Sequence, residues 1–171
     1  MLNAVHQLRL SSWIIAAGAI RNLVWDELHG FAVRAPLQDI DLVFYAERLN
    51  REEESVRIHV TQQKLQQDFS AANWGLVNQA SVHLWLQQFN ESKVQAFANL
   101  EDGIASWPKI ATCVGVYLDE HRHQMLTAHG LEDLFALRVR HNTTMLSKAT
   151  YQAPLQAKNF LARWPRLQIL L

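Results

Sequence analysis

The stretch "QDIDLVFYAE", residues 38–47, joins an acidic pair directly to an apolar run. Asp39 and Asp41 are two positions apart, and the four residues after them are Leu, Val, Phe and Tyr. This aromatic and β-branched composition after Pro36 predicts a strand over residues 39–46. Side chains two positions apart on a strand share one face, so we expect the two carboxylates to project together. In the alternative interpretation the acids are solvated in a turn before the strand begins.

The acidic pair has the composition of a metal site. Cα atoms of strand residues i and i+2 are about 6.6–6.8 Å apart, so both carboxylates can approach one divalent cation or bridge two. Mg²⁺, or Mn²⁺ in its place, prefers oxygen ligands and needs only one or two protein carboxylates when substrate phosphates complete its shell. We therefore expect Asp39 and Asp41 to bind Mg²⁺.

A second element upstream predicts a phosphate site. In "WIIAAGAIRN", residues 13–22, a buried strand is expected to end at Gly18, where a helix begins. Free backbone N–H groups at a helix start favour phosphate, and a glycine there lets a ligand approach the backbone. Arg21 and Asn22 add donors in the first turn. The alternative is an ordinary strand–helix turn with a solvated arginine; together with the acidic pair, however, the element predicts a nucleotide site.

The rest of the chain alternates helices with strands. This order predicts an α+β fold in which helices flank a mixed sheet, and the length of 171 residues predicts a single domain over 1–171. Helices are expected at 4–10, at 19–30, at 50–69 with Asn50 and Glu53 as a capping box, at 91–100 and at 154–164. We also expect a strand near Trp74 that turns helical by Ala80, a strand pair over 112–130, and a short helix followed by a strand over 131–140.

Composition excludes several classes of function. Sixteen basic and sixteen acidic residues give a formal net charge of +0, so no nucleic-acid partner is indicated. The longest apolar run, residues 13–20, is too short to span a membrane; it could mimic a signal-peptide core, but a strand leading into a helix explains it better. A single cysteine fits a reducing, cytoplasmic location. The P-loop, serine-esterase elbow and paired-cysteine zinc motifs are absent from the sequence.

Several segments resemble a known family. Gly18-Ala19 at a strand end, followed by Asp39-Ile40-Asp41, resembles the motifs of the polymerase-β-like nucleotidyltransferase superfamily. More narrowly, the chain resembles a bacterial nucleotidyltransferase-like family of unknown substrate. The segments that carry this resemblance are spread along nearly the whole chain: "AGAIRNLVWDELHG", "DIDLVFY", "NQASVH", "WPKIATCVGV", "AHGLEDLF" and "KNFLARWPRL".

The resemblance implies a function. A nucleoside triphosphate and Mg²⁺ would bind at the edge of the sheet, where an acceptor group attacks the α-phosphorus and expels pyrophosphate. Asp39 and Asp41 would bind the metal, and Gly18 and Ala19 would position the triphosphate. The acceptor is not indicated. A catalytically degenerate nucleotide-binding or protein-interaction module on the same fold is the alternative.

The sequence departs from the superfamily at two positions. Ala19 replaces the usual serine. The phosphate contact that the serine hydroxyl makes in the superfamily must therefore come from the backbone or from Arg21. Asn78 stands where a third carboxylate is expected on the next strand, and Asp133 is a candidate substitute. Gln79 and His83, four residues apart on a predicted helix, could share a polar face near the site; a hydrogen-bonded structural histidine is the other interpretation.

Overall fold

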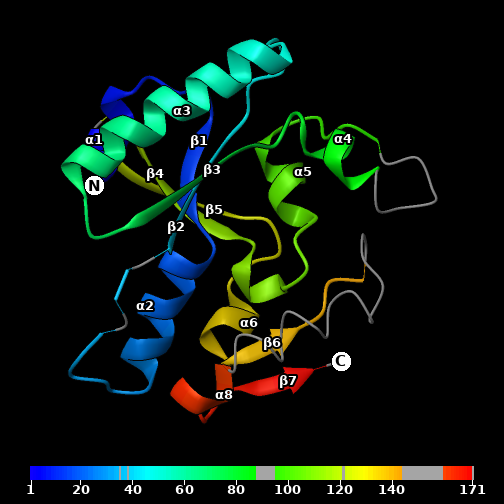
Figure 1. Ribbon diagram of the computed structural model, residues 1–171. Coiled ribbons are helices and arrows are strands. Elements are labelled where there is room, and N and C mark those ends of the chain that lie inside the picture. The colour runs from blue at the N-terminus through cyan, green and yellow to red at the C-terminus, as the bar shows by residue number, and fades with distance from the viewer. Residues whose placement is uncertain (35, 38, 88–94, 121, 144–159, 171) are drawn as a thin grey trace.

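The computed structural model describes residues 1–34, 36–37, 39–87, 95–120, 122–143 and 160–170, which form a mixed α+β fold (Figure 1). The expected fold class is confirmed. Five strands form one sheet in the order β3-β2-β1-β4-β5, with β2 and β3 parallel and the other neighbours antiparallel. The strands are β1 Trp13–Ala16, β2 Asp39–Phe44, β3 Asn73–Asn78, β4 Val114–Asp119, β5 Arg122–Thr127, β6 Arg138–Arg140 and β7 Gln168–Leu170. The helices are α1 Leu2–Gln7, α2 Gly18–Leu28, α3 Arg51–Asp68, α4 Val82–Leu86, α5 Leu100–Ala105, the 3-10 helix η1 Ile110–Thr112, α6 Glu132–Phe135 and α8 Phe160–Arg163.

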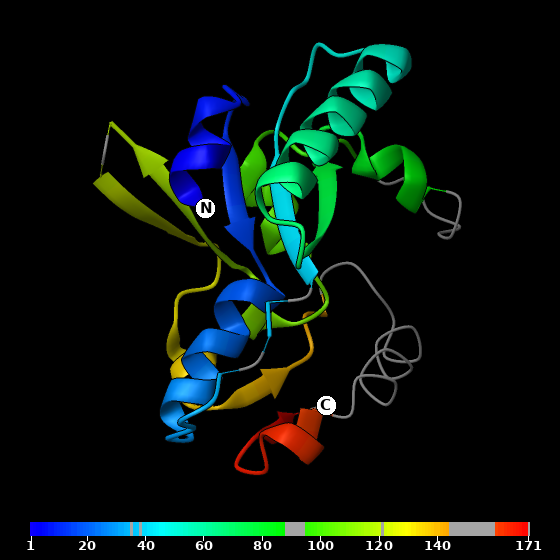
Figure 2. The same cartoon turned by 60° about the vertical axis from the view of Figure 1, so that its left-hand side comes forward.

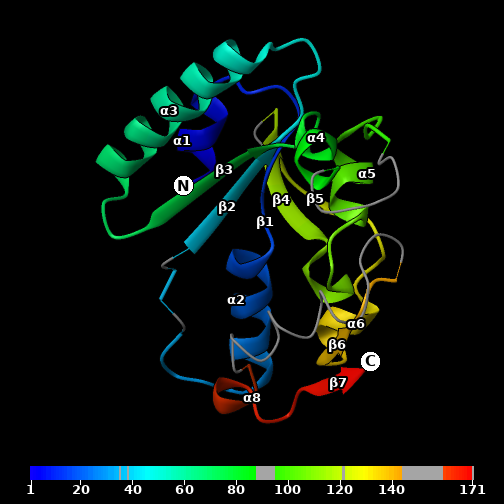
Figure 3. The ribbon, with the colours of Figure 1, turned by 45° about the vertical axis from the view of Figure 1, so that its right-hand side comes forward.

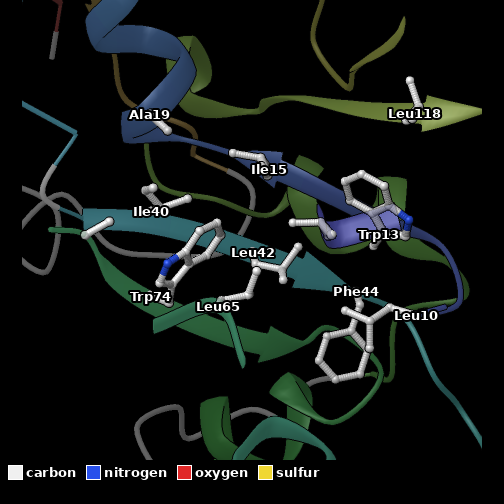
Figure 4. Close-up of a cluster of buried hydrophobic side chains, with 12 residues drawn as sticks. Leu10, Trp13, Ile15, Ala19, Ile40, Leu42, Phe44, Leu65, Trp74 and Leu118 are labelled. Carbon is white, nitrogen blue, oxygen red and sulfur yellow. The ribbon is translucent and has the colours of Figure 1, made fainter. Parts of the chain in front are cut away.

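Helices cover both faces of the sheet, with α1 and α3 on one side and α4 and α5 on the other (Figure 3). Side chains alternate along β2, so Ile40, Leu42 and Phe44 pack on the α3 side with Leu65 of that helix (Figure 4). Val43 packs on the opposite side with residues of α5. The same alternation places Asp39 and Asp41 on the Val43 side. Strand β2 thus belongs to the core on one face and to the site on the other.

Helix α3 begins with the predicted capping box. The Asn50 side chain accepts hydrogen bonds from the backbone N–H groups of Glu52 and Glu53, both at 3.0 Å, and the Glu53 carboxylate accepts one from the Asn50 N–H at 3.0 Å. We expect Asn50→Ala to lower the free energy of unfolding by about 1 kcal/mol, because two helix-terminal donors lose their acceptor. Urea titration measures the change. Asn50→Asp should keep most of the stability, and an equal loss in both variants would contradict the capping role.

The C-terminal residues pack against α2. Strand β7 pairs in parallel with β6, and α8 and β7 lie beneath α2 in the views of Figures 1 and 2. Trp25 of α2 is fully buried and makes edge-on contacts with Phe160 and Trp164, with ring centroids 5.8 and 5.3 Å apart. The end of the chain is thereby held next to the helix that follows β1.

Several predicted helices differ from the observed ones. The helix expected at 4–10 is observed at Leu2–Gln7, and the helix expected by Ala80 begins only at Val82, so Gln79 and His83 do not share a helix. Of the helix expected at 91–100, residues 91–94 lie outside the described residues and 95–99 are not helical. Helix α5 begins only at Leu100, because the Asn99 side chain accepts a hydrogen bond from the Asp102 N–H at 2.9 Å and caps the helix there. Of the helix expected at 154–164, residues 154–159 lie outside the described residues, and α8 accounts for the described part.

The expected strand pair over 112–130 is present as β4 and β5, and α6 followed by β6 confirms the expectation for 131–140. Within the described residues, no helix combines the length and the apolar character needed to cross a membrane. The single-domain organisation and the cytoplasmic location stay predictions.

Candidate functional site

Asp41 lies between two residues with small side chains. In the register of the sheet it faces Ala16 of β1 on one side and Gly75 of β3 on the other. A Cβ atom at Gly75 would lie 3.5 Å from Asp41 Oδ1, an ordinary van der Waals distance, so Gly75 is directly beside the carboxylate. Because both neighbours have small side chains, they leave the Asp41 oxygens accessible to a ligand.

Asp39 shares the face of Asp41 and is the more exposed of the two. The Asn73 side chain donates a long hydrogen bond of 3.5 Å to Asp39 Oδ1. Within the described residues no group of three or more His, Cys, Asp or Glu side chains is arranged to hold a metal. Two carboxylates on one face nevertheless fit Mg²⁺, which takes one or two protein carboxylates and fills its other positions with water and phosphate oxygens.

The turn between β1 and α2 has an unusual backbone conformation. Ala17, the N-cap of α2, has φ 51° and ψ −119°, a conformation that costs a non-glycine residue about 1–3 kcal/mol. Its carbonyl accepts the Arg21 N–H at 2.9 Å and so closes the first helical turn. The N–H groups of Gly18 and Ala19 lie in this turn, where an α-helix leaves its donors without helical partners. The end of β1 thus presents backbone donors at the edge of the site.

Arg21 is almost completely buried, with 5% of its surface exposed. Its Nε and Nη2 atoms donate to Asn22 Oδ1 at 3.2 and 2.8 Å, and its guanidinium lies 5.0 Å from the Trp25 ring centroid. No carboxylate of the described residues lies within 4 Å of it. Burial lowers the pKa of Arg21 to about 10, an effect that the negative charge of Asp41 partly offsets. The guanidinium is therefore a charged group at neutral pH, held by neutral partners.

A cavity of about 850 Å³ brings these elements together. One part of its lining carries the charged groups, and another part is apolar, formed by residues such as Ile58, Leu76, Val82 and Trp85. The predicted site residues that line it are Gly18, Ala19, Arg21, Asn22, Asp39, Asp41, Asn78 and Gln79. His83 is not among the described lining residues; its Nδ1 atom is buried without a hydrogen-bond partner.

Gln79 forms part of the cavity wall between β3 and α5. Its side chain packs over Gly103, where an added Cβ would lie 2.6 Å from Gln79 Oε1. Only 2% of the Gln79 surface is exposed, and its Oε1 atom is buried without a hydrogen-bond partner among the described residues. A buried acceptor without a partner is uncommon in a folded protein.

Asn78 does not occupy the position expected for a third carboxylate. It pairs with Phe44, three positions along β3 from Gly75, and three strand residues span about 10 Å. Its Oδ1 accepts from the Ala46 N–H at 2.9 Å, and its Nδ2 donates to Glu54 Oε2 at 2.7 Å. Asn78 is therefore a structural link between β2, β3 and α3. The residues of β3 on the face of the acidic pair are Asn73, Gly75 and Val77, none of them acidic.

Asp133 does not substitute for the missing acid either. It is buried in α6, accepts two hydrogen bonds from Arg140 at 2.8 and 3.1 Å, and is not among the described residues that line the cavity. A further carboxylate that lines the cavity is Glu54, which accepts hydrogen bonds from Asn78 Nδ2 and from the Ser81 hydroxyl, both at 2.7 Å.

Sequence reasoning missed Glu54 and Lys109, which both line the cavity. Glu54 stands among three consecutive glutamates in the first turn of α3, where acids ordinarily stabilise the helix dipole. Lys109 lies in "WPKIATCVGV", one of the segments that carry the family resemblance, but that resemblance assigned it no role. Glu54 carries no sequence signal that separates it from an ordinary acid at a helix start.

Comparison with known proteins identifies the family. A family model described as "Nucleotidyltransferase" matches residues 3–169. The chain belongs to this nucleotidyltransferase family. A solved structure described as an NMR structure that reveals a CCA-adding enzyme head domain is similar to it, with a TM-score of 0.80 and 27% sequence identity over 98% of this chain and 86% of that chain. A comparison with curated proteins gave no match.

The family and the fold establish this nucleotidyltransferase as an enzyme of nucleotidyl transfer, and the resemblance found in the sequence is confirmed. Membership implies a nucleoside triphosphate as substrate. The alternative of a catalytically degenerate module is not favoured by these findings.

Proposed function

We propose that the protein transfers a nucleoside monophosphate from a nucleoside triphosphate to an acceptor, with Asp39 and Asp41 binding Mg²⁺ or Mn²⁺. One observation carries the proposal: this carboxylate pair, the first turn of α2 and the buried cation Arg21 all line the same cavity. Anionic oxygens on one side and cationic donors on the other match a metal-bound triphosphate.

The residues have separate roles in the proposed reaction. The N–H groups of Gly18 and Ala19 bind phosphate oxygens in place of the serine hydroxyl that the superfamily uses, and Arg21 neutralises phosphate charge from beneath. Asn22 orients Arg21 through its two hydrogen bonds. The aspartates hold the metal, which when bound neutralises charge that develops on the phosphates.

The acceptor enters from the apolar part of the cavity. An oxygen or similar atom of the acceptor forms a bond to the α-phosphorus and gives up its proton to water, while the bond to the β-phosphate oxygen breaks and pyrophosphate leaves with the electron pair. Fixing the reactants in line and stabilising the charge supply most of the acceleration.

Metal removal tests the proposal. We expect at least one of ATP, GTP, CTP and UTP to raise the melting temperature when Mg²⁺ or Mn²⁺ is present, and EDTA to abolish the rise. At a ligand concentration one hundred times Kd the stabilisation is about 2.7 kcal/mol. Pyrophosphate release with a small-molecule extract as acceptor source then tests turnover. A melting temperature that no triphosphate changes in the presence of metal would contradict the proposal.

A further inference from the structure

The apolar part of the cavity lies at the edge of the sheet. Strand β3 is an edge strand, because in the five-stranded sheet it pairs only with β2. At this edge the cavity is lined by α3, which covers one face of the sheet, and by α4, which covers the other (Figure 3). The apolar residues found here are Ile58 of α3, Leu76 and Val77 of β3, and Val82, Trp85 and Leu86 of α4. This lining suits a ligand with an apolar body.

The Glu54 carboxylate lies in the wall of this apolar part. Glu54 and Ile58 are four positions apart on α3, both are half-buried, and both line the cavity. Glu52 and Glu53, in the same helical turn, are exposed. The inner face of α3 therefore places a negative charge beside the apolar residues.

Among the described residues, Glu54 is held by neutral groups. Its Oε2 atom accepts a hydrogen bond from Asn78 Nδ2 and its Oε1 atom accepts one from the Ser81 hydroxyl, both at 2.7 Å. No lysine, arginine or histidine nitrogen of the described ranges lies within 4.0 Å of it. A carboxylate has about four lone-pair sites, so two donors leave room for another. The helix dipole stabilises the charge by only about 0.3–1 kcal/mol, and a cationic group of a ligand would neutralise it.

The outer edge of β3 is closed to an added polypeptide strand. The Trp74 carbonyl accepts a hydrogen bond from Gln62 Nε2 at 2.7 Å, and the Asn78 carbonyl accepts one from the Ser81 N–H at 3.2 Å. Strand addition needs a row of unpaired backbone groups, and these two bonds occupy the row at both ends. The apolar part therefore fits a small molecule better than an extended peptide.

Glu54 and the acidic pair are separated along β3. Glu54 contacts Asn78, whereas Asp41 faces Gly75, and the three strand residues from Gly75 to Asn78 span about 10 Å. A small molecule bound to Glu54 through one end can therefore present its other end to the α-phosphorus beside Asp41.

We infer that the acceptor is a small amphipathic amine whose ammonium group binds Glu54 and whose hydroxyl attacks the α-phosphorus. This inference rests on the proposed function. A protonated amine has no free electron pair, so it binds as a cation and leaves the attack to the hydroxyl. The apolar body lies between α3 and α4, where Trp85, one helical turn after Ser81, adds an aromatic face that attracts cations.

Three probe molecules of similar shape test the inference without metal or nucleotide. Tyramine is a cation at neutral pH, tyrosol has a neutral hydroxyl in place of the amine, and para-hydroxyphenylacetate is an anion. Heteronuclear NMR titrations give Kd from the amide shifts. The wild-type protein should bind tyramine at least about tenfold more tightly than tyrosol, the effect of one charge-assisted contact, and the anion more weakly than either. Equal affinity for tyramine and tyrosol, or shifts that do not include α3 and α4, would overturn the inference.

Glu54→Gln removes the charge and keeps an oxygen that can accept a hydrogen bond. The preference for tyramine over tyrosol should fall below about threefold, while the affinity for tyrosol stays the same. Glu52→Gln, the same change at an exposed position of the same helical turn, is the control and should keep the preference. A purely structural role would lower the melting temperature of Glu54→Gln and leave its preference unchanged, which contradicts the inference. If Glu54→Gln fails to fold, the three probes on the wild-type protein still decide the outcome.

The outcomes separate this inference from the proposed function. A tyramine preference that depends on Glu54 supports the amine site even if no triphosphate is stabilised by metal, and only the proposed transfer then fails. Metal-dependent stabilisation by a triphosphate without any tyramine preference supports the proposed function and overturns the inference.

Discussion

Asp41→Asn is expected to reduce nucleotidyl transfer by about a thousandfold or more, the scale of loss when a main source of transition-state charge stabilisation is removed. Asparagine has nearly the same shape as aspartate but lacks the negative charge that holds a divalent cation. The neighbours across the sheet, Ala16 and Gly75, carry no group that could replace the carboxylate. The Mg²⁺-dependent rise in melting temperature with a triphosphate should disappear as well.

The matched control is Asp68→Asn, which makes the same chemical change at an exposed position at the end of α3. It should leave both transfer and nucleotide stabilisation unchanged. Circular dichroism should show an intact fold for both variants, since the Asp41 side chain faces the cavity. If Asp41→Asn kept metal-dependent nucleotide stabilisation, the assignment of Asp41 as a metal ligand would be wrong.

The parts of the site that could be predicted from sequence are those with a local pattern. The apolar run after Asp41 defines β2, and its period of two places both aspartates on one face. The change from an apolar strand to a helical pattern at Gly18 defines the start of α2. Both features depend on residues close in sequence, so they can be read without the tertiary structure.

The remaining features depend on pairings between distant residues. The register of β2 and β3 decides that Gly75, and not Asn78, lies beside Asp41. A strand pattern alone leaves such a register open, and one step would move every side chain to the other face. Phe160 meets Arg21 and Lys109 only because the C-terminal segment folds back on α2, which no short motif indicates.

The attachment of this C-terminal segment depends on a buried carboxylate in α2. Asp26 has no exposed surface. Its oxygens accept hydrogen bonds from Arg163 Nε and Nη2 at 3.1 and 3.0 Å and from Trp164 Nε1 at 2.8 Å. We expect Asp26→Ala to lower the free energy of unfolding by about 3–5 kcal/mol, because a guanidinium and an indole N–H lose their buried acceptor. Urea denaturation followed by tryptophan fluorescence measures the loss.

The adjacent residue provides the control. Glu27 also pairs with an arginine, but its side chain and that of Arg34 are 75% and 62% exposed at a distance of 3.3 Å. Glu27→Ala should therefore cost no more than about 1 kcal/mol. Equal stability losses in the two variants would show that the C-terminal segment stays in place without this carboxylate.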